Sequence, residues 1–461
     1  MAARGGDMWP GGDTVNHLIF DRDASFRRGL QPFRPSARIG RKSGAKRIVL
    51  LQGPVGPFFR ELKDALDQAR CDVWRISFSA GDRLFARRDK LIRFRGDLSD
   101  WECWFADFCD VAEIDSLVLF GAERPVHRVA RKVAEAKDVE VVSLEEGYIR
   151  SGFISVEDRG NNAASPLAGR LPPPGFVPDP SCAERGGEFR ALGRKSLYGL
   201  AYYAAQTLLT FGASRQLFHR PMRALPEIFC WVRNGWRRLV DQSRNFIKIQ
   251  QLLEHCDGRY FIVPLQVEAD MQMKGAALGW THPKLISALL KSFARHAPPD
   301  CRLVFKVHPL ERGHHSHGAL IADTAEAYGI RDQVDVIDTG SMGLMTRHAA
   351  GMITINSTSG FSAIHHGVPL LVVGAALYAH PELATCAMGA PDFDSFWSKR
   401  YVASAEVRRN YLAWIREEAL VPGDFYDPEG VQTACRGILG KLAGDRQQQQ
   451  EDESQELRTA C

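Results

Sequence analysis

The sequence predicts an α/β fold made of two halves, each built around a parallel sheet, and two observations carry this prediction. Apolar runs alternate with amphipathic helical stretches between residues 47 and 150, and the same alternation returns between residues 258 and 374. This strand–helix–strand order is typical of parallel sheets, whose neighbouring strands are joined by helices. The proline-rich stretch 171–180 separates the halves, because proline cannot supply the hydrogen bonds of a central strand.

The first half contains two similar units. Residues 47–78 predict a strand, a Gly/Pro loop, an amphipathic helix with its apolar residues on one face, and a second strand. Residues 116–120 and 140–144 predict two further strands, joined by a helix that begins near residue 125. Ligands of such sheets bind beyond the carboxyl ends of the strands, so we expect functional residues in the loops there.

The second half follows the same plan. Strands are expected at 302–309 and 334–338, with a helix around 283–296. Residues 351–374 predict a strand, a polar loop, a helix and a strand in compact form. Between the halves, residues 194–250 are helical in character, aromatic and basic.

These features divide the chain into segments and imply a cleft between the two halves. The expected segments are an irregular or disordered N-terminal tail (1–46), a first Rossmann-like domain (47–170), a Pro-rich linker with a basic aromatic helical segment (171–257), a second Rossmann-like domain with terminal helices (258–440), and a disordered tail (441–461).

Composition places the chain among ordinary globular proteins. It has 461 residues, of which 45% are hydrophobic and 25% charged, and a formal net charge of +4, which gives no support for nucleic-acid binding. The ten cysteines are scattered singly, so we expect reduced thiols. The N-terminus lacks the apolar core of a signal peptide, and no stretch has the length of a membrane span. We therefore expect a cytoplasmic protein.

An acidic cluster, "SLEEGYIR" (143–150), falls at the end of the last predicted strand of the first half. Glu145 and Glu146 are expected to follow that strand, with Gly147 forming a tight turn. A carboxylate that is partly desolvated there would have a raised pKa suited to proton transfer. The alternative is a solvated acidic turn.

A histidine stands at the end of a predicted strand in "FKVHPLERG" (305–313). Pro309 restricts the chain, so His308 would face the cleft, with Lys306 close by. Two such groups suit a phosphate or a developing anion better than a metal ion. The alternative is a strand-end histidine that is bonded to a backbone carbonyl.

Four polar residues, Asn356, Ser357, Thr358 and Ser359, precede a predicted helix that begins near Gly360. Hydroxyls and backbone amides at a helix N-terminus bind phosphate oxygens well, although ordinary N-capping needs only one such residue. The run therefore predicts a phosphate site, with plain capping as the alternative.

Polar residues alternate in "PLQVEADMQM" (264–273). In an extended chain Gln266, Glu268, Asp270 and Gln272 would share one face, directed either to solvent or into a ligand site. The histidines of "RGHHSHG" have no zinc-like spacing, and we expect a surface loop there rather than a metal site.

The order of these motifs resembles that of bacterial sialyltransferases of the two-domain GT-B type, which use CMP-activated nine-carbon sugar acids. The resemblance is closer to the capsule polysaccharide biosynthesis and export family, with its KpsS-like β-Kdo transferases that build the lipid-linked terminus of group 2 capsules. It extends over about residues 47–400 and rests on "GPVGPFF", "FSAGDRLF", "ERPVHRVA", "LEEGYIR", "PLQVEAD", "KVHPLERG", "NSTSGFSAIHHGVPLLVVG" and "FW" at 396–397. It implies a GT-B-like fold with an acceptor domain followed by a donor domain.

The resemblance also implies roles for the second-half motifs. His308 and Lys306 would contact the phosphate of the CMP leaving group beside Pro309, and Ser357 and Thr358 would bind the same phosphate, flanked by Asn356 and Ser359. A departing phosphate that is stabilised in this way needs no metal, so no metal and no cofactor is expected.

Carboxylates are expected to divide the remaining chemistry. By the resemblance, Glu146 or Glu145 would activate the acceptor hydroxyl, and retention of configuration would need a nucleophile, Asp270 or else Glu268. Sugar and acceptor would contact Gln266, Glu268, Arg150 and Gly53. The family usually has proline after the arginine of the acidic motif, but here Ser151 and Gly152 follow Arg150, so the geometry on the acceptor side is open to question.

The function implied is transfer of Kdo from CMP-Kdo to a lipid, either phosphatidylglycerol or a Kdo-lipid, in capsule synthesis and export. The expected partners are the CMP-sugar donor, the lipid acceptor, the inner-membrane surface through the basic aromatic segment, and other capsule assembly proteins, but no nucleic acid. Two alternatives stay open: a non-catalytic export factor that binds the lipid-linked glycan, and an inverting CMP-sialic acid transferase.

Overall fold

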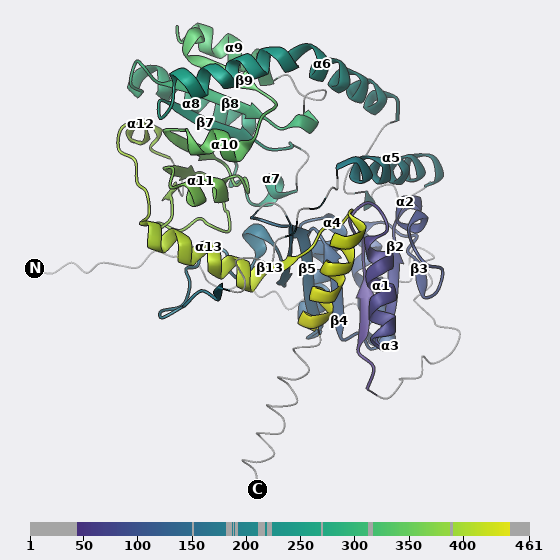
Figure 1. The fold of residues 1–461 in the computed structure, drawn as a ribbon. Helices are drawn as coiled ribbons and strands as arrows, with labels where there is room; N and C mark the ends of the chain where they lie inside the picture. The colour runs from purple at the N-terminus through teal and green to yellow at the C-terminus, as the bar shows by residue number, and fades with distance from the viewer. Residues whose placement is uncertain are drawn as a thin grey trace, which may run out of the picture.

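The computed structural model describes residues 44–149, 152–180, 187, 189, 192–210, 217–218, 224–268, 271–311, 317–387 and 391–442. The two tails that the sequence predicts to be disordered, 1–46 and 441–461, lie outside these ranges except for residues 44–46 and 441–442. Two sheets form the centres of two halves of the molecule, which are the lower right and the upper left of Figure 1.

The first sheet has seven strands in the order β13-β6-β5-β4-β1-β2-β3. Strands β1 to β5 pair in parallel, whereas β6 runs antiparallel to both β5 and β13. The strands are β1 (Arg47–Leu50), β2 (Asp72–Ser77), β3 (Leu91–Arg93), β4 (Ser116–Phe120), β5 (Glu140–Glu146), β6 (Phe153–Asp158) and β13 (Leu420–Pro422). The helices of this half are α1 (Phe58–Gln68), α2 (Ala80–Leu84), α3 (Leu98–Ala112) and α4 (Pro125–Ala136).

Helices cover both faces of the first sheet. Successive residues of β1 point to opposite faces, so Leu50 lies in the core formed with Leu62 of α1, and Val49 in the core formed with Trp101 of α3. The helix 428–442 joins α1 on its face of the sheet. Burial on both faces explains why the strands read as continuous apolar runs.

The second sheet has six parallel strands in the order β12-β11-β10-β7-β8-β9. They are β7 (Tyr260–Leu265), β8 (Arg302–Val307), β9 (Val334–Ile337), β10 (Gly351–Thr354), β11 (Leu370–Val372) and β12 (Thr385–Cys386). Its helices are α7 (Gln272–Gly275), α8 (His282–His296), α9 (His317–Ala327), α10 (Met342–Arg347), α11 (Gly360–His366), α12 (Phe393–Phe396) and α13 (Ala405–Ala419). Core side chains of α8, α9 and α12 pack on one face, and those of α10, α11 and α13 on the other.

The chain returns to the first sheet at its end, which the sequence does not predict. Strand β13 pairs with β6, and Phe425 and Ile438 lie in the core of the first half. The expected second domain, 258–440, therefore includes residues that belong to the first sheet. The signal is weak in sequence because β13 has only 3 residues.

The expected basic aromatic segment consists of two helices, α5 (Leu192–Leu209) and α6 (Ala224–His255), within the described residues. They belong to different halves: α5 lies over the first half and α6 crosses the second (Figure 1). Tyr202 of α5 is bonded to a residue of α2, and Leu252 of α6 lies in the core of the second half.

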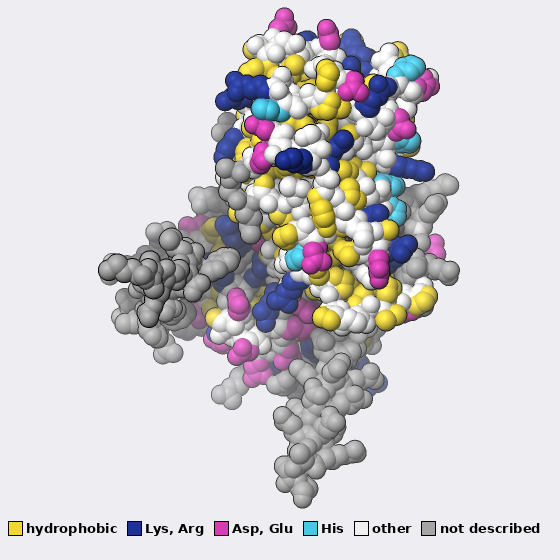
Figure 2. All heavy atoms as spheres, turned by 90° about the vertical axis from the view of Figure 1, so that its left-hand side faces the viewer, with side chains coloured by type: hydrophobic (Ala, Val, Ile, Leu, Met, Phe, Trp, Pro, Cys, Tyr) yellow, Lys and Arg dark blue, Asp and Glu magenta, His cyan; other side chains and the backbone are white. Residues whose placement is uncertain are grey.

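These observations confirm the predicted α/β, GT-B-like fold class with two Rossmann-like halves, while the cleft between the halves stays a prediction. Within the described part of the chain, none of the helices combines the length and apolar character needed to cross a bilayer. On the face shown in Figure 2, basic and acidic side chains are interspersed with apolar ones.

Candidate active site

Arg124 connects two loops at the edge of the first sheet where the parallel strands have their carboxyl ends. It follows β4 and donates from Nη1 to Gln52 Oε1 (2.9 Å) and to the Gly53 carbonyl (3.3 Å), both just beyond β1. Its guanidinium lies 5.1 Å from the centre of the Phe120 ring. Only glycine fits at residue 53, because an added Cβ would stand 2.7 Å from the Phe59 ring. Arg124 therefore holds the backbone of the loop at Gly53.

Glu145 lies beside this arginine. A Cβ added at Gly121 would be 3.2 Å from Arg124 Nε and 3.5 Å from Glu145 Oε2, so both side chains crowd around that glycine. Gly121 also has a φ of +78°, a conformation that disfavours other residues. A turn that favours glycine thus leaves room for the arginine and the carboxylate beside the same backbone position at the sheet edge.

Tyr202 of α5 lies against the same edge of the first sheet and bonds to two of its residues. Gln52 Nε2 donates to Asp82 Oδ1 (3.2 Å) and to Tyr202 Oη (2.9 Å), and Tyr202 Oη donates to the same Asp82 oxygen (2.6 Å). All three residues are buried or nearly so, and burial together with Asp82 raises the pKa of Tyr202. The phenol therefore stays protonated and keeps donating.

His127 joins two of these loops. Its Nε2 accepts from the Gln52 backbone N–H (3.3 Å), so its Nδ1 must carry the proton that reaches the Gly121 carbonyl (2.9 Å). Burial and the nearby Arg124 lower its pKa to about 3. It is therefore a neutral structural histidine that fixes the loops after β1 and β4.

The two predicted acids do not lie where the sequence places them. Strand β5 continues through Glu146, so neither acid follows the strand, and the two side chains point to opposite faces. Glu146 is 55% exposed and pairs with Lys195 of α5, so the expected partial desolvation is absent there. Glu145 is half-buried and lies beside Arg124. Of the two, only Glu145 lies near Arg124.

His308 stands just beyond β8, as predicted, at the equivalent edge of the second sheet. It is half-buried, its N–H donates to the Leu265 carbonyl (3.2 Å), and its carbonyl accepts from the Glu311 N–H (2.9 Å). Lys306 is 7% exposed within β8, and the Pro309 carbonyl accepts from Asn234 of α6 (3.0 Å). Backbone bonds on both sides therefore hold the histidine loop.

The segment after β7 is not an extended strand, which corrects the expected alternation. Strand β7 ends at Leu265, and Gln272 is the first residue of α7, so Gln266 and Gln272 do not share one strand face. Glu268 is exposed, and its N–H donates to Glu311 Oε1 (3.3 Å). Asp270 and Arg150 lie outside the described residues, as do residues 312–316 of the histidine-rich loop.

The Asn-Ser-Thr-Ser run forms a tight loop between β10 and α11. Asn356 donates to the Gln272 carbonyl (3.2 Å), and Ser357 Oγ accepts from the Ser359 N–H (3.2 Å). Helix α11 has only 7 residues, with Ser359 at its N-cap and no side-chain capping bond. Capping therefore does not account for the run, while Thr358 and Ser359 are half-buried at the sheet edge.

Tyr378 packs against the loop formed by residues 356–359. Its hydroxyl donates to the Ser357 carbonyl (2.5 Å), and a Cβ at Gly360 would overlap its ring. Gly360 is therefore required for the loop to rest on the tyrosine.

An aromatic contact connects the two edges. Tyr148, from the acidic motif, stacks on Phe361 of α11 with ring centroids 5.6 Å apart and planes at 14°. The Tyr148 hydroxyl donates to Glu157, a buried carboxyl whose pKa is raised by burial and which Ser165 and Asn161 also contact. The acidic motif and the Ser/Thr motif are thus held in one packed unit.

Sequence reasoning missed several residues of this region, namely Gln52, Asp82, Arg124, Tyr148, Tyr202 and Tyr378. Asp82, Arg124 and Tyr148 stand inside motifs that carry the resemblance, "FSAGDRLF", "ERPVHRVA" and "LEEGYIR", and could have been considered. Among the residues that the structure describes, no group of three or more His, Cys, Asp or Glu side chains is placed to hold a metal ion.

Comparison with known proteins identifies the family. The family described as "Capsule polysaccharide biosynthesis protein" matches residues 115–426, a span that contains all four polar motifs of the candidate site. The chain belongs to this family. The capsule polysaccharide export protein KpsS of Escherichia coli is 31% identical over 340 residues, which are 72% of this chain and 86% of that protein.

Other similar proteins include the capsule polysaccharide modification protein LipB of Neisseria meningitidis serogroup B, 28% identical over 400 residues that cover 83% of this chain and 92% of LipB. Among solved structures, the Thermosulfurimonas dismutans KpsC beta Kdo 2,7 transferase has a TM-score of 0.39 and 15% identity, covering 86% of this chain and 100% of that one. The MnaA–UDP structure from S. aureus has a TM-score of 0.33 and 10% identity, covering 87% and 97%. Both scores are too low to support a conclusion about this chain.

Proposed function

We propose that this capsule polysaccharide biosynthesis protein is a glycosyltransferase that moves Kdo from CMP-Kdo to a lipid acceptor, phosphatidylglycerol or a Kdo-lipid. The observation that carries the proposal is the pair of sheet edges, one with Arg124 and Glu145 and the other with His308 and the Ser/Thr loop. The stacking of Tyr148 on Phe361 holds the two edges in one unit. The two edges differ in their functional groups, with a carboxylate and an arginine at one and a histidine, a lysine and hydroxyls at the other, which suits two substrates of different chemistry.

The second edge would bind the CMP part of the donor. His308 and Lys306 would offer positive charge or hydrogen-bond donors, and Ser357, Thr358 and Ser359 hydroxyls and amides, to the phosphate as it departs. Asn356 would contact another part of the donor. Its Nδ2 donates to the Gln272 carbonyl, and its Oδ1, which is buried without a hydrogen-bond partner among the described residues, would accept from a hydroxyl or amino group, because an acceptor oxygen cannot bond to a phosphate. Donors that are fixed in advance stabilise the developing charge without reorganisation, so no metal is required.

The first edge would bind the acceptor, with the Gly53 loop beneath it. Glu145, held near Arg124, would take the proton from the acceptor hydroxyl as that oxygen attacks the sugar, a role for which Glu146 is the second candidate. A retaining reaction adds an earlier step, in which Asp270, or else Glu268, attacks the anomeric carbon and CMP leaves. Gln266 and Arg150 would contact the sugar.

We place the protein at the cytoplasmic face of the inner membrane, where a lipid acceptor and other capsule assembly proteins would be within reach. The second candidate function is that of a non-catalytic export factor that binds the lipid-linked glycan, because the E. coli relative is named an export protein. The third is an inverting CMP-sialic acid transferase, which needs the base but no nucleophile.

A transfer assay tests the proposal. Purified full-length protein is incubated with CMP-Kdo, generated in place because it is labile, and fluorescent phosphatidylglycerol or a Kdo-lipid, with EDTA present. Mass spectrometry should show a gain of one or more Kdo residues. Folded protein that yields no product with any of these acceptors would favour the export reading, and a product formed only from CMP-sialic acid would favour the third.

A further inference from the structure

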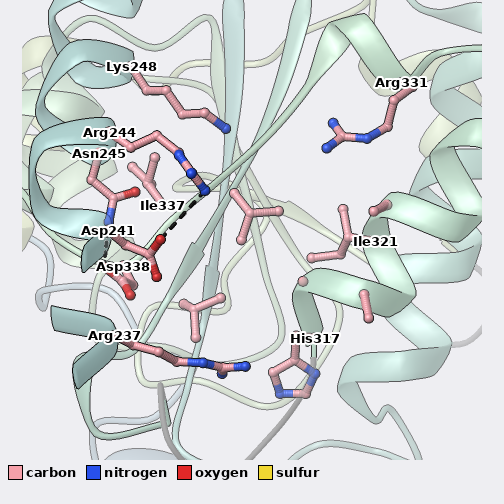
Figure 3. A pocket seen from close by; sticks show the side chains of 15 residues that line it. Arg237, Asp241, Arg244, Asn245, Lys248, His317, Ile321, Arg331, Ile337 and Asp338 are labelled. Atoms are coloured by element: carbon pink, nitrogen blue, oxygen red, sulfur yellow. Dashed lines mark hydrogen bonds and ion pairs between the residues drawn. The ribbon is translucent and has the colours of Figure 1, made fainter. Parts of the chain in front are cut away.

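A basic cavity of about 310 Å³ lies at the outer edge of the second sheet, beside the edge strand β9 and between α6 and α9 (Figure 3). It does not include His308 or the Ser/Thr loop. Its lining comes from α6, the end of β8, the start of α9, β9 and Arg331. Its lining residues thus differ from those that we assign to the two substrates, although Val307 directly precedes His308.

Positive charge dominates this cavity. Arg237, Arg244 and Lys248 enter from α6 and Arg331 from the opposite wall, and Lys248 and Arg331 point toward each other across the space. The two acids of the lining are already engaged: Asp241 Oδ1 lies 3.6 Å from Arg244 Nη1, and Asp338 Oδ1 accepts from Asn245 (2.7 Å). Lys248 also lies 3.5 Å from Oδ1 of Asp335, an acid outside the lining, so four cationic groups face three carboxylates. The remaining excess of positive charge still suits an anion.

Helix α6 places an apolar stripe directly beside the cavity. Trp236, Val240 and Ile247 are 69%, 51% and 56% exposed, and each immediately precedes a residue that lines the cavity. Their spacing puts them on one side of the helix, next to the stripe that carries Arg237 and Lys248. The buried face of α6, which includes Leu252, lies on the far side of the cavity-lining residues from the apolar stripe.

An exposed apolar stripe flanked by basic residues is the pattern of a helix that lies in the surface of an anionic bilayer. A free phosphate or a nucleotide would use the charges but would leave Trp236 and Ile247 in water. Helix α5 also exposes apolar residues at helical spacing, Leu197, Leu200 and Leu208. The combination favours a lipid whose headgroup is charged and whose chains are apolar.

We propose that the α6–β9 cavity binds the phosphate of an anionic phospholipid while Trp236, Val240 and Ile247 enter the bilayer surface. This inference rests on the proposed function, because it specifies how a transferase with a lipid acceptor is held at the membrane. It assigns the phosphate contacts to Arg237, Arg244, Lys248 and Arg331.

Vesicle binding tests the inference without any sugar transfer. Full-length protein is floated with vesicles of phosphatidylcholine alone or with 30 mol% phosphatidylglycerol, a composition chosen as roughly that of an anionic leaflet. The double variant Arg244→Gln/Lys248→Gln should bind the anionic vesicles at least tenfold more weakly, since each basic residue near such a surface contributes roughly fivefold. Trp236→Ser/Ile247→Ser should also weaken binding.

A matched control uses Arg128→Gln/Lys132→Gln, which removes two exposed basic residues at the same spacing from α4 and should bind as the wild type does. Wild-type protein that ignores phosphatidylglycerol, or a cavity variant that binds as well as the control, would overturn the inference. So would release from vesicles by millimolar CMP or inorganic phosphate. Transfer to a detergent-dispersed acceptor is measured separately: the cavity variant should keep it, and a wild type without it would count against the proposed function alone.

Discussion

The two sheet edges hold their functional groups in different ways. At the first edge, side chains bond to side chains: Gln52, Asp82 and Tyr202 form a closed buried set, and Arg124 joins it through Gln52. At the second edge, the bonds of the His308 and Ser357 loops run mainly through the backbone. The first edge is thus a rigid polar network, whereas the second is a set of positioned loops. We therefore expect substitutions at the first edge to disturb the side-chain network. Substitutions of side chains at the second edge should leave the backbone bonds of its loops intact.

The largest expected effect is at Glu145. Glu145→Gln removes the proposed base and should lower kcat for transfer by roughly 10²- to 10⁴-fold, the usual contribution of general acid–base catalysis. Glu146→Gln is the matched control, because Glu146 is exposed and pairs with Lys195, and it should keep most of the activity. If Glu146→Gln were the more damaging, the base would be Glu146.

His308→Ala should lower kcat/KM for CMP-Kdo by roughly 10²- to 10³-fold, the size of effect seen when one donor to a developing anion is removed. Folding should change little, because the loop is held by backbone bonds at Leu265 and Glu311. The control is His296→Ala, an exposed histidine of α8. Unchanged kcat/KM in a folded His308→Ala protein would remove His308 from the site.

Gly360→Ala should destabilise the protein by about 1–3 kcal/mol and disturb the Ser/Thr loop, because the new methyl group overlaps the Tyr378 ring. Gly343→Ala is the control: its methyl group would have ordinary contacts, the nearest at 3.8 Å, in helix α10. Chemical denaturation measures both. Equal stability of the two variants would contradict the tight packing beneath the loop.

A further expected effect concerns pH and the first edge. The pKa of His127 is lowered to about 3 in the fold from an ordinary 6.5, so the fold favours its neutral form. The resulting stability is complete above pH 6.5 and is lost as pH falls toward 3, by up to about 1.4 kcal/mol per pH unit. His127→Gln should flatten this part of the stability profile between pH 6.5 and 4. Parallel profiles for the two proteins would contradict a buried neutral histidine.

The contrast between the edges also explains what could be predicted from sequence. The strands, and the positions of His308 and the Ser/Thr loop beyond them, follow from local apolar runs that end in polar residues. The first-edge network does not, because it depends on pairs such as Gln52 and Tyr202, which are 150 residues apart. The same limit hid the return of β13 to the first sheet. The different positions of Glu145 and Glu146 are visible only in the structure, because the sequence does not show that β5 continues through both residues.

The division of labour between the edges is tested most directly by measuring CMP release and lipid product separately in His308→Ala and Glu145→Gln. The account predicts that His308→Ala slows both. Glu145→Gln should still release a first equivalent of CMP but form little glycolipid, because donor cleavage precedes acceptor attack in a retaining reaction. A Glu145→Gln protein that loses CMP release and lipid product in equal proportion, or a folded His308→Ala protein that loses neither, would contradict separate donor and acceptor edges.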